Sequence, residues 1–107
     1  MPELAVREYR LLKQTAAGTV TTTAIQVPVA IGNRTRSAYA SSENAGGAWA
    51  LEVHGRPEGS GGTWTTLATL TGSGVSADID TCLNCGEYRV DVTTPGTNLL
   101  QVWITGG

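Results

Sequence analysis

The sequence predicts an all-β protein, and three features support that prediction. The composition, with 14 glycines beside many threonines and valines, suits strands and tight turns and suits long helices poorly. Short runs of alternating apolar and polar residues recur at spacings of roughly 8–14 residues, and glycine- or proline-containing breaks separate them. We therefore expect a single antiparallel β-sandwich, jelly-roll-like, of about seven or eight short strands.

The length fits one compact domain. A chain of 107 residues is too short for two hydrophobic cores and long enough for one. Residues 1–107 are thus expected to form a single domain. Residues 1–8 are polar and charged and contain nothing that demands burial, so they are a candidate extended arm.

The strands expected in the N-terminal half have the weaker patterns. Residues 8–15 fit a strand, which we prefer, and also the end of a short helix. Residues 21–29 and 35–41 are plausible strands, and Pro28 confines the first of them to a sheet edge or a strand end.

The clearest hairpin lies in the middle of the chain. Residues 48–55 alternate Leu51 and Val53 against Glu52 and His54, which predicts a half-buried strand. A glycine-rich break follows, and residues 63–70 then resume a period of two, with Trp64, Thr66, Ala68 and Leu70 on one face. The two runs predict one hairpin with a long loop.

Three further runs follow towards the C-terminus. Residues 75–80 alternate Val75, Ala77 and Ile79 against polar residues, and residues 87–92 form the clearest half-buried strand of the chain. In residues 99–104 the second face, which includes Leu99 and Trp103, is unusually apolar. This last strand is therefore a candidate for cover on both sides.

Charge and hydropathy exclude two classes of partner. The formal net charge is −2 and the 7 Lys and Arg are scattered, so no basic stripe is available to a nucleic acid. No apolar run approaches the roughly 20 residues needed to span a bilayer, so we expect no membrane partner. The first residues carry charges where a signal peptide has an apolar stretch, so we expect the chain to start in the cytosol.

Recognised catalytic motifs are missing from the sequence. His54 is the only histidine and lies on the polar face of a strand, a setting typical of a solvated surface residue. Neither a G-x-S-x-G elbow nor an S-x-x-K pair is present, and the glycine-rich breaks lack the Lys-Ser/Thr of a phosphate-binding loop. We expect no enzyme activity, no catalytic or metal-binding residues and no cofactor.

Cys82 and Cys85 leave three alternatives open. They are reduced thiols in a turn, or they form a local disulfide in an oxidising medium, or they contribute to a metal site shared between subunits. We favour the first. Asp78 and Asp80 alternate on a strand and could contribute to a calcium site, but such carboxylates are more often simply solvated.

The tryptophans also allow two interpretations. Exposed Trp and Tyr on a β-sandwich can stack against sugars, as in carbohydrate-binding modules. Because the chain has no Phe, we favour Trp49, Trp64 and Trp103 as core residues.

Residues 48–106 carry a resemblance to a known group of proteins. The runs AWALEVHGRPEGSGGTWTTLATLTGSGV, GEYRVDVTT and LLQVWITG resemble the small β-sandwich structural proteins of tailed bacteriophages. The HGRPEG turn and the two cysteines depart from the pattern. The resemblance implies a virion protein, most plainly a capsid decoration (cement) protein that assembles as a dimer or trimer and clamps the joints between major capsid protein subunits. It also implies that the chain is assembled into virions in the host cytoplasm.

Two other functions remain open beside that one. The first is a tail, fibre or baseplate module of similar design that binds host glycans. The second is an enzyme or metalloprotein centred on Cys82, Cys85 and His54.

The sequence indicates two candidate interface regions. One is the N-terminal segment with Glu3, Val6, Arg7 and Arg10, and the other is the loop 33–37 with Arg34 and Arg36. Mobile ends and basic loops readily become ordered on a partner, which is why we select them.

Overall fold

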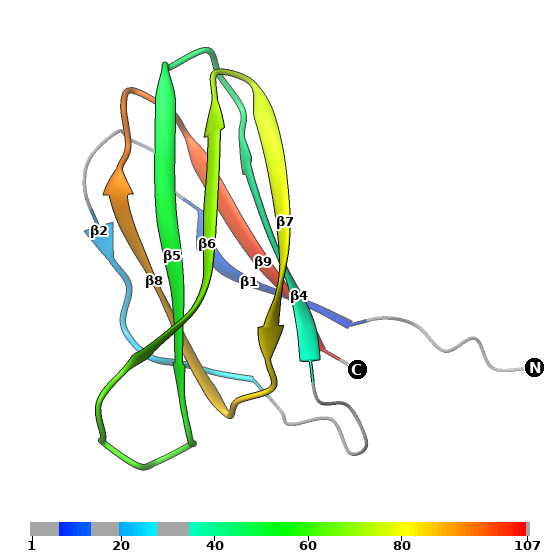
Figure 1. Cartoon of the computed structure of the whole chain (residues 1–107), viewed down its shortest axis with the longest axis vertical. Helices are drawn as coiled ribbons and strands as arrows, with labels where there is room; N and C mark the ends of the chain where they lie inside the picture. Colours follow the sequence, from blue (N-terminus) through cyan, green and yellow to red (C-terminus); the bar gives the residue numbers. More distant parts are fainter. Residues whose placement is uncertain (1–6, 14–19, 28–34, 107) are drawn as a thin grey trace, which may run out of the picture.

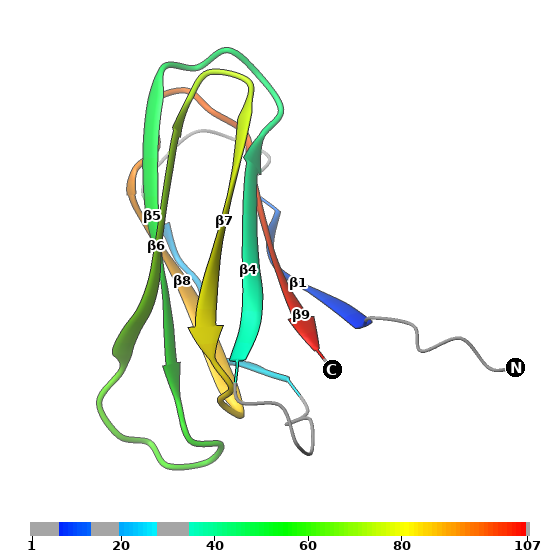
Figure 2. The ribbon, with the colours of Figure 1, turned by 45° about the vertical axis from the view of Figure 1, so that its right-hand side comes forward.

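The computed structural model of the chain describes residues 7–13, 20–27 and 35–106. Within these ranges all the regular secondary structure is β-strand, and the strands form two antiparallel sheets packed face to face (Figure 1; Figure 2). The predicted β-sandwich is confirmed.

Each sheet has four strand positions. Sheet A has the order β1 (Arg7–Lys13), β9 (Leu100–Gly106), β4 (Thr35–Ser42), β7 (Ser76–Leu83). Sheet B has the order β2 (Val20–Thr21), β8 (Glu87–Thr94), β5 (Ala48–Arg56), β6 (Thr65–Ser73). The short strand β3 (Ile25–Gln26) also pairs with β8, so β2 and β3 share one edge.

The order of the strands is that of a jelly roll. Apart from β2 to β3 and the β5–β6 hairpin, each strand is followed by one in the opposite sheet. The two ends of the described chain therefore meet in sheet A, where β1 pairs with β9. Such crossing connections are typical of double-sheet Greek-key folds, and the expected jelly-roll-like arrangement is confirmed.

The core lies between the sheets and is built by the inward side of each strand. Because side chains alternate along a strand, one side of it is buried and the other side forms an outer face. The largest fully buried side chains are Trp49, Tyr88, Leu51, Leu70, Leu100, Ile104, Val27, Val53, Val90, Val92, Val102 and Asn98.

Most of the expected strands are found near their expected positions. The run 8–15 is a strand and not the end of a helix, and the predicted hairpin is β5–β6. One expectation is wrong: Arg36 does not lie in a loop, because β4 begins at Thr35. Arg36 lies on the inward side of β4 and is buried.

A bulge in β6 corrects the predicted position of Trp64. Val53 pairs with Ala68, but the next residue of β5, His54, pairs with Thr66, so β6 has one extra residue at Leu67. The extra residue reverses the alternation. Trp64 consequently lies on the outer face of sheet B and not with Ala68 in the core.

Asn98 joins two loops at one end of the sandwich. Its side-chain oxygen accepts hydrogen bonds from Ser42 Oγ at 2.8 Å and the Gly46 amide at 3.2 Å, and its Nδ2 donates to the carbonyls of Gly47 and Pro95. A fully buried amide is tolerated because its polar atoms are bonded in this way.

Candidate functional site

The outer face of sheet A carries exposed apolar side chains. Tyr39 of β4 is 37% exposed, and Ile79 and Leu83 of β7 are 64% and 60% exposed. Tyr39 pairs with Ile79 on one side and with Trp103 of β9 on the other, and Trp103 pairs with Arg10 of β1. Arg10, Trp103, Tyr39 and Ile79 thus form one row across the sheet.

This face lacks charge over three strands. None of the outward residues of β4, β9 and β7 whose side chains the structure describes is charged: Ser37, Tyr39, Ser41, Gln101, Trp103, Thr105, Ala77, Ile79, Thr81 and Leu83. The outer face of sheet B, by contrast, carries Glu52, His54, Arg56, Arg89 and Asp91. The sheet A face combines aromatic and aliphatic side chains with Ser, Thr and Gln, and it shares the lack of charge and the presence of Trp and Tyr with the centres of protein interfaces.

In β7 the polar side chains of Ser76 and Asp78 point inward and the apolar side chain of Ile79 points outward. The inward side contacts β6 of the other sheet and the edge of the core. Asp78 accepts hydrogen bonds from the backbone N–H of Thr71 in β6 at 3.0 Å and of Ile79 at 3.0 Å. Ser76 Oγ accepts from the Trp49 indole N–H at 3.1 Å. The polar residues of β7 therefore serve the contact with β6 and the core, and its apolar residues face outward.

The same carboxylates occupy the free edge of β7. Asp80 Oδ1 accepts from the Thr81 amide at 2.9 Å, as Asp78 Oδ1 does from Ile79. An added strand would need these backbone donors, and edge carboxylates are a known device against such pairing. Contact through the face of sheet A is thus favoured over strand addition at β7.

Trp103 is held in a fixed orientation on this face. Its Nε1 donates to Gln101 Oε1 at 3.3 Å, and Gln101 Nε2 donates in turn to the Glu43 carboxylate. The Arg10 guanidinium lies 5.7 Å from the centre of the indole ring. Arg10 and Glu43 place one positive and one negative charge at the margin of the uncharged area.

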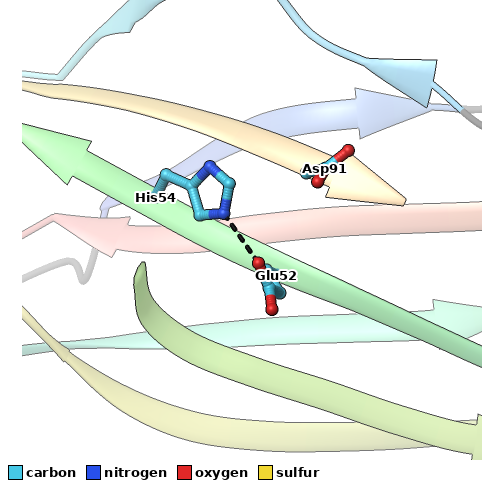
Figure 3. A group of neighbouring side chains, drawn as sticks. All are labelled: Glu52, His54 and Asp91. Carbon is cyan, nitrogen blue, oxygen red and sulfur yellow. Dashed lines mark hydrogen bonds and ion pairs between the residues drawn. The ribbon is translucent and has the colours of Figure 1, made fainter. Parts of the chain in front are cut away.

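A second group lies on the outer face of sheet B. Glu52 and His54 project from β5 and Asp91 from β8, and one potential ligand atom of each lies within 4.8 Å of the others (Figure 3). These residue types can bind a transition metal. His54 was expected to be solvated, but it is only 7% exposed, because neighbouring side chains cover it.

The hydrogen bonds of His54 do not fit a metal centre. Arg89 Nε donates to His54 Nδ1 at 2.9 Å, and because a guanidinium cannot accept, Nδ1 must be the unprotonated nitrogen. The proton of the neutral ring is then on Nε2, which donates to Glu52 Oε1 at 2.9 Å. No imidazole lone pair points at the carboxylates. In this arrangement Arg89, His54 and Glu52 form a hydrogen-bonded chain, and Asp91 accepts a hydrogen bond from Thr21 Oγ1 at 2.8 Å.

An adjoining network fixes the glycine-rich loop 57–64. The guanidinium groups of Arg56 and Arg89 lie 4.1 and 4.9 Å from the centre of the Trp64 ring. Arg56 also donates to Glu87 Oε2 at 2.8 Å and to the Gly62 carbonyl at 2.9 Å. The hydrogen bond from Arg56, followed by that from the Gly59 amide, lowers the pKa of Glu87.

Cys82 and Cys85 are free thiols in the structure. Burial raises the pKa of Cys82 to about 11, and burial also raises that of Cys85. Both groups are therefore protonated at neutral pH and are poor nucleophiles. Beside them, Tyr88 Oη accepts from the Cys85 amide at 2.7 Å and donates to the Leu83 carbonyl at 3.0 Å.

Of the six predicted interface residues, the structure describes Arg7, Arg10 and Arg36. Glu3, Val6 and Arg34 lie outside the described residues, and Arg7 is part of β1. Arg10 is exposed at the margin of the sheet A face. Arg36 is buried, donates to Asn84 Oδ1 at 2.8 Å and lies over the Tyr88 ring, so it is a structural residue and not a surface contact.

The tryptophans divide between core and surface. Trp49 is buried as predicted, whereas Trp64 and Trp103 are half-buried on opposite outer faces. The uncharged face itself was missed at the sequence level, although the second apolar side of residues 99–104 is part of its signal.

Comparisons with known protein families, curated proteins and solved structures find no match. In the part of the chain that is described, no helix has the length and apolarity to cross a bilayer.

Proposed function

We propose that this chain is a structural protein of a tailed-phage virion, most specifically a capsid decoration protein that binds the assembled shell and stabilises it across the joints between capsomers. It acts by contact and performs no reaction. The resemblance of residues 48–106 to such proteins suggests that the chain belongs to a phage virion. The surface of the structure supports the idea that it acts by contact.

The observation that carries the proposal is the uncharged outer face of sheet A. Ile79, Leu83 and Tyr39 are exposed there, beside the fixed Trp103. Monomeric proteins rarely leave such a surface in water, and aromatic side chains are enriched at binding hot spots. On the opposite face the charged side chains have partners within the chain: Arg89 and Glu52 bond to His54, and Arg56 bonds to Glu87.

Stabilisation of a shell follows from linkage. A protein that binds only the assembled lattice favours the intact shell over its ruptured state. Many copies on a symmetric shell make even weak contacts effective, because each bound copy adds to the total.

The test is quantitative mass spectrometry of purified particles from the phage that encodes the chain. We expect the chain in many copies, in fixed proportion to the major capsid protein. We also expect particles that lack it to lose their DNA at lower temperature. Its absence from purified particles would overturn the proposal.

A tail, fibre or baseplate module that binds glycans is the second candidate. Trp103 and Tyr39 are cross-strand neighbours on an exposed face, an arrangement that can stack against a sugar ring. Binding on a glycan array that is lost in Trp103→Ala would favour this function. Trp49, which is buried, cannot take that role.

A further inference from the structure

We infer that the outer face of sheet A is covered by a second copy of the same face, so that the chain forms a two-fold dimer through β9, β4 and β7. The inference deepens the proposed function by naming the partner that this surface binds when the chain is free in solution, and it rests on that function for the role of the dimer in a virion.

Charge is the first reason to choose a second copy. A charged partner would lose water from its ionic groups without gaining a counterion on this face, which costs free energy. The face itself is uncharged at its centre, and its margin carries Arg10 and Glu43, of opposite sign, together with the carboxylates of Asp78 and Asp80 at the β7 edge. Two copies can therefore meet without burying a charge, and the marginal residues can pair across the interface.

Symmetry is the second reason. In a two-fold contact the same patch is used on both subunits, so the patch must complement itself. The row Trp103, Tyr39 and Ile79 consists of aromatic and aliphatic side chains, which pack against their own kind. The carboxylates at the β7 edge disfavour the alternative symmetric contact, in which two β7 strands would join edge to edge.

The size of the face predicts the strength of the dimer. β7 has 8 residues, so it is about 26 Å long, and the three strands β9, β4 and β7 are about 14 Å wide. The face is thus roughly 360 Å² and two copies bury about 730 Å² together, which is below the usual range of stable complexes and typical of a weak, transient contact. We therefore expect a dimer whose dissociation constant lies in the micromolar range or above, reinforced when many copies share a shell.

Sedimentation equilibrium of the full chain, from about 1 µM to about 1 mM, tests the inference. We expect the average mass to rise from one chain to two over this range. Ile79→Lys should weaken dimerisation at least about tenfold, because it places two like charges in a desolvated contact.

A matched control variant is Val75→Lys. Val75 is 70% exposed, like Ile79 at 64%, but it lies in the turn between β6 and β7 and not on a strand of the face. This variant should dimerise as the unmodified chain does. Far-ultraviolet circular dichroism of both variants should match that of the unmodified chain, since neither residue is in the core.

Any of the following results would overturn the inferred dimer. A chain that stays monomeric up to about 1 mM has no such contact. Equal weakening by both variants, or by neither, places the contact elsewhere. A monomer that still binds purified shells and loses that binding in Ile79→Lys would assign the face to the capsid. Presence in virions decides the proposed function separately, whatever the result of sedimentation.

Discussion

At the scale of single residues, the hydrogen bonds of His54 determine which of its ring nitrogens carries the proton. Arg89 bonds to Nδ1 and Glu52 to Nε2, so the neutral ring has one favoured tautomer. Because His54 is the only histidine, its signals can be assigned without ambiguity.

We predict that nitrogen NMR of the neutral imidazole finds the proton on Nε2. In Arg89→Met this preference should weaken, because Nδ1 loses its donor. Zn²⁺ should leave the thermal midpoint of the unmodified chain unchanged. A proton on Nδ1, or a rise in the midpoint with stoichiometric Zn²⁺, would contradict our account of the network.

Asn98 is the residue whose loss should most affect the loops at its end of the sandwich. Asn98→Ala leaves the Gly46 amide and the Gly47 and Pro95 carbonyls without the bonds that the side chain provides. We predict a loss of about 3 kcal/mol in the free energy of unfolding, measured by urea denaturation with an unchanged slope. A loss below about 1 kcal/mol would show that water replaces these bonds.

The cysteines make a prediction about reactivity. Because burial raises the pKa of Cys82 to about 11, its thiolate is scarce near neutral pH. In the folded protein iodoacetamide should modify the half-buried Cys85 before Cys82, and Cys82 should react at its normal rate only after unfolding. Peptide mass spectrometry measures both sites. Early modification of Cys82 would contradict its buried position.

At the scale of elements, the loop 57–64 depends on one carboxylate. Glu87 bonds to Arg56 and to the Gly59 amide, and its pKa is lowered from an ordinary value of 4.5. A lowered pKa in the folded state means that these bonds stabilise the fold above the ordinary pKa and are lost as the pH falls towards the lowered one.

We therefore predict a fall in thermal midpoint between about pH 6 and about pH 3, part of which comes from Glu87. In Glu87→Gln this fall should be smaller, with a lower midpoint at the higher pH, because the amide cannot form the charged bond. Calorimetry over that pH range measures both quantities. An identical pH dependence in the variant would contradict the role given to Glu87.

Alternation predicted most strands, because a period of two marks any strand that is buried on one side. It could not predict which face of β7 is buried. Ile79 is apolar and exposed because Asp78 is needed by an amide of β6, a contact that depends on the packing of the two sheets. The bulge at Leu67 and the position of Trp64 are likewise set by strand pairing, which no local pattern encodes.

At the scale of the whole molecule, the two outer faces differ in kind. Sheet B is covered with charged side chains that bond to each other, whereas sheet A exposes Tyr39, Ile79 and Leu83. The candidate interface predicted from basic residues was incomplete for this reason. Among those whose side chains the structure describes, Arg10 lies at the margin of the face and Arg36 is buried inside the fold.

The interface residues predicted from the sequence differ from the residues of the sheet A face, because single basic residues can be recognised in a sequence and a surface shared by several strands cannot. Basic residues are visible in the sequence one by one, but an uncharged surface arises only when β4, β7 and β9 are placed side by side. That arrangement joins strands that lie far apart in the sequence, at residues 35–42, 76–83 and 100–106. The apolar second side of residues 99–104 is its one local sign.

Hydroxyl-radical footprinting of the full chain at low and high concentration asks whether the outer face of sheet A is the surface through which the chain makes contact. We predict that Tyr39, Trp103, Ile79 and Leu83 become protected from oxidation as the chain assembles, while Trp64 and Val75 stay as reactive as before. Protection of the sheet B face instead, or equal oxidation of the sheet A face at every concentration, would contradict this prediction.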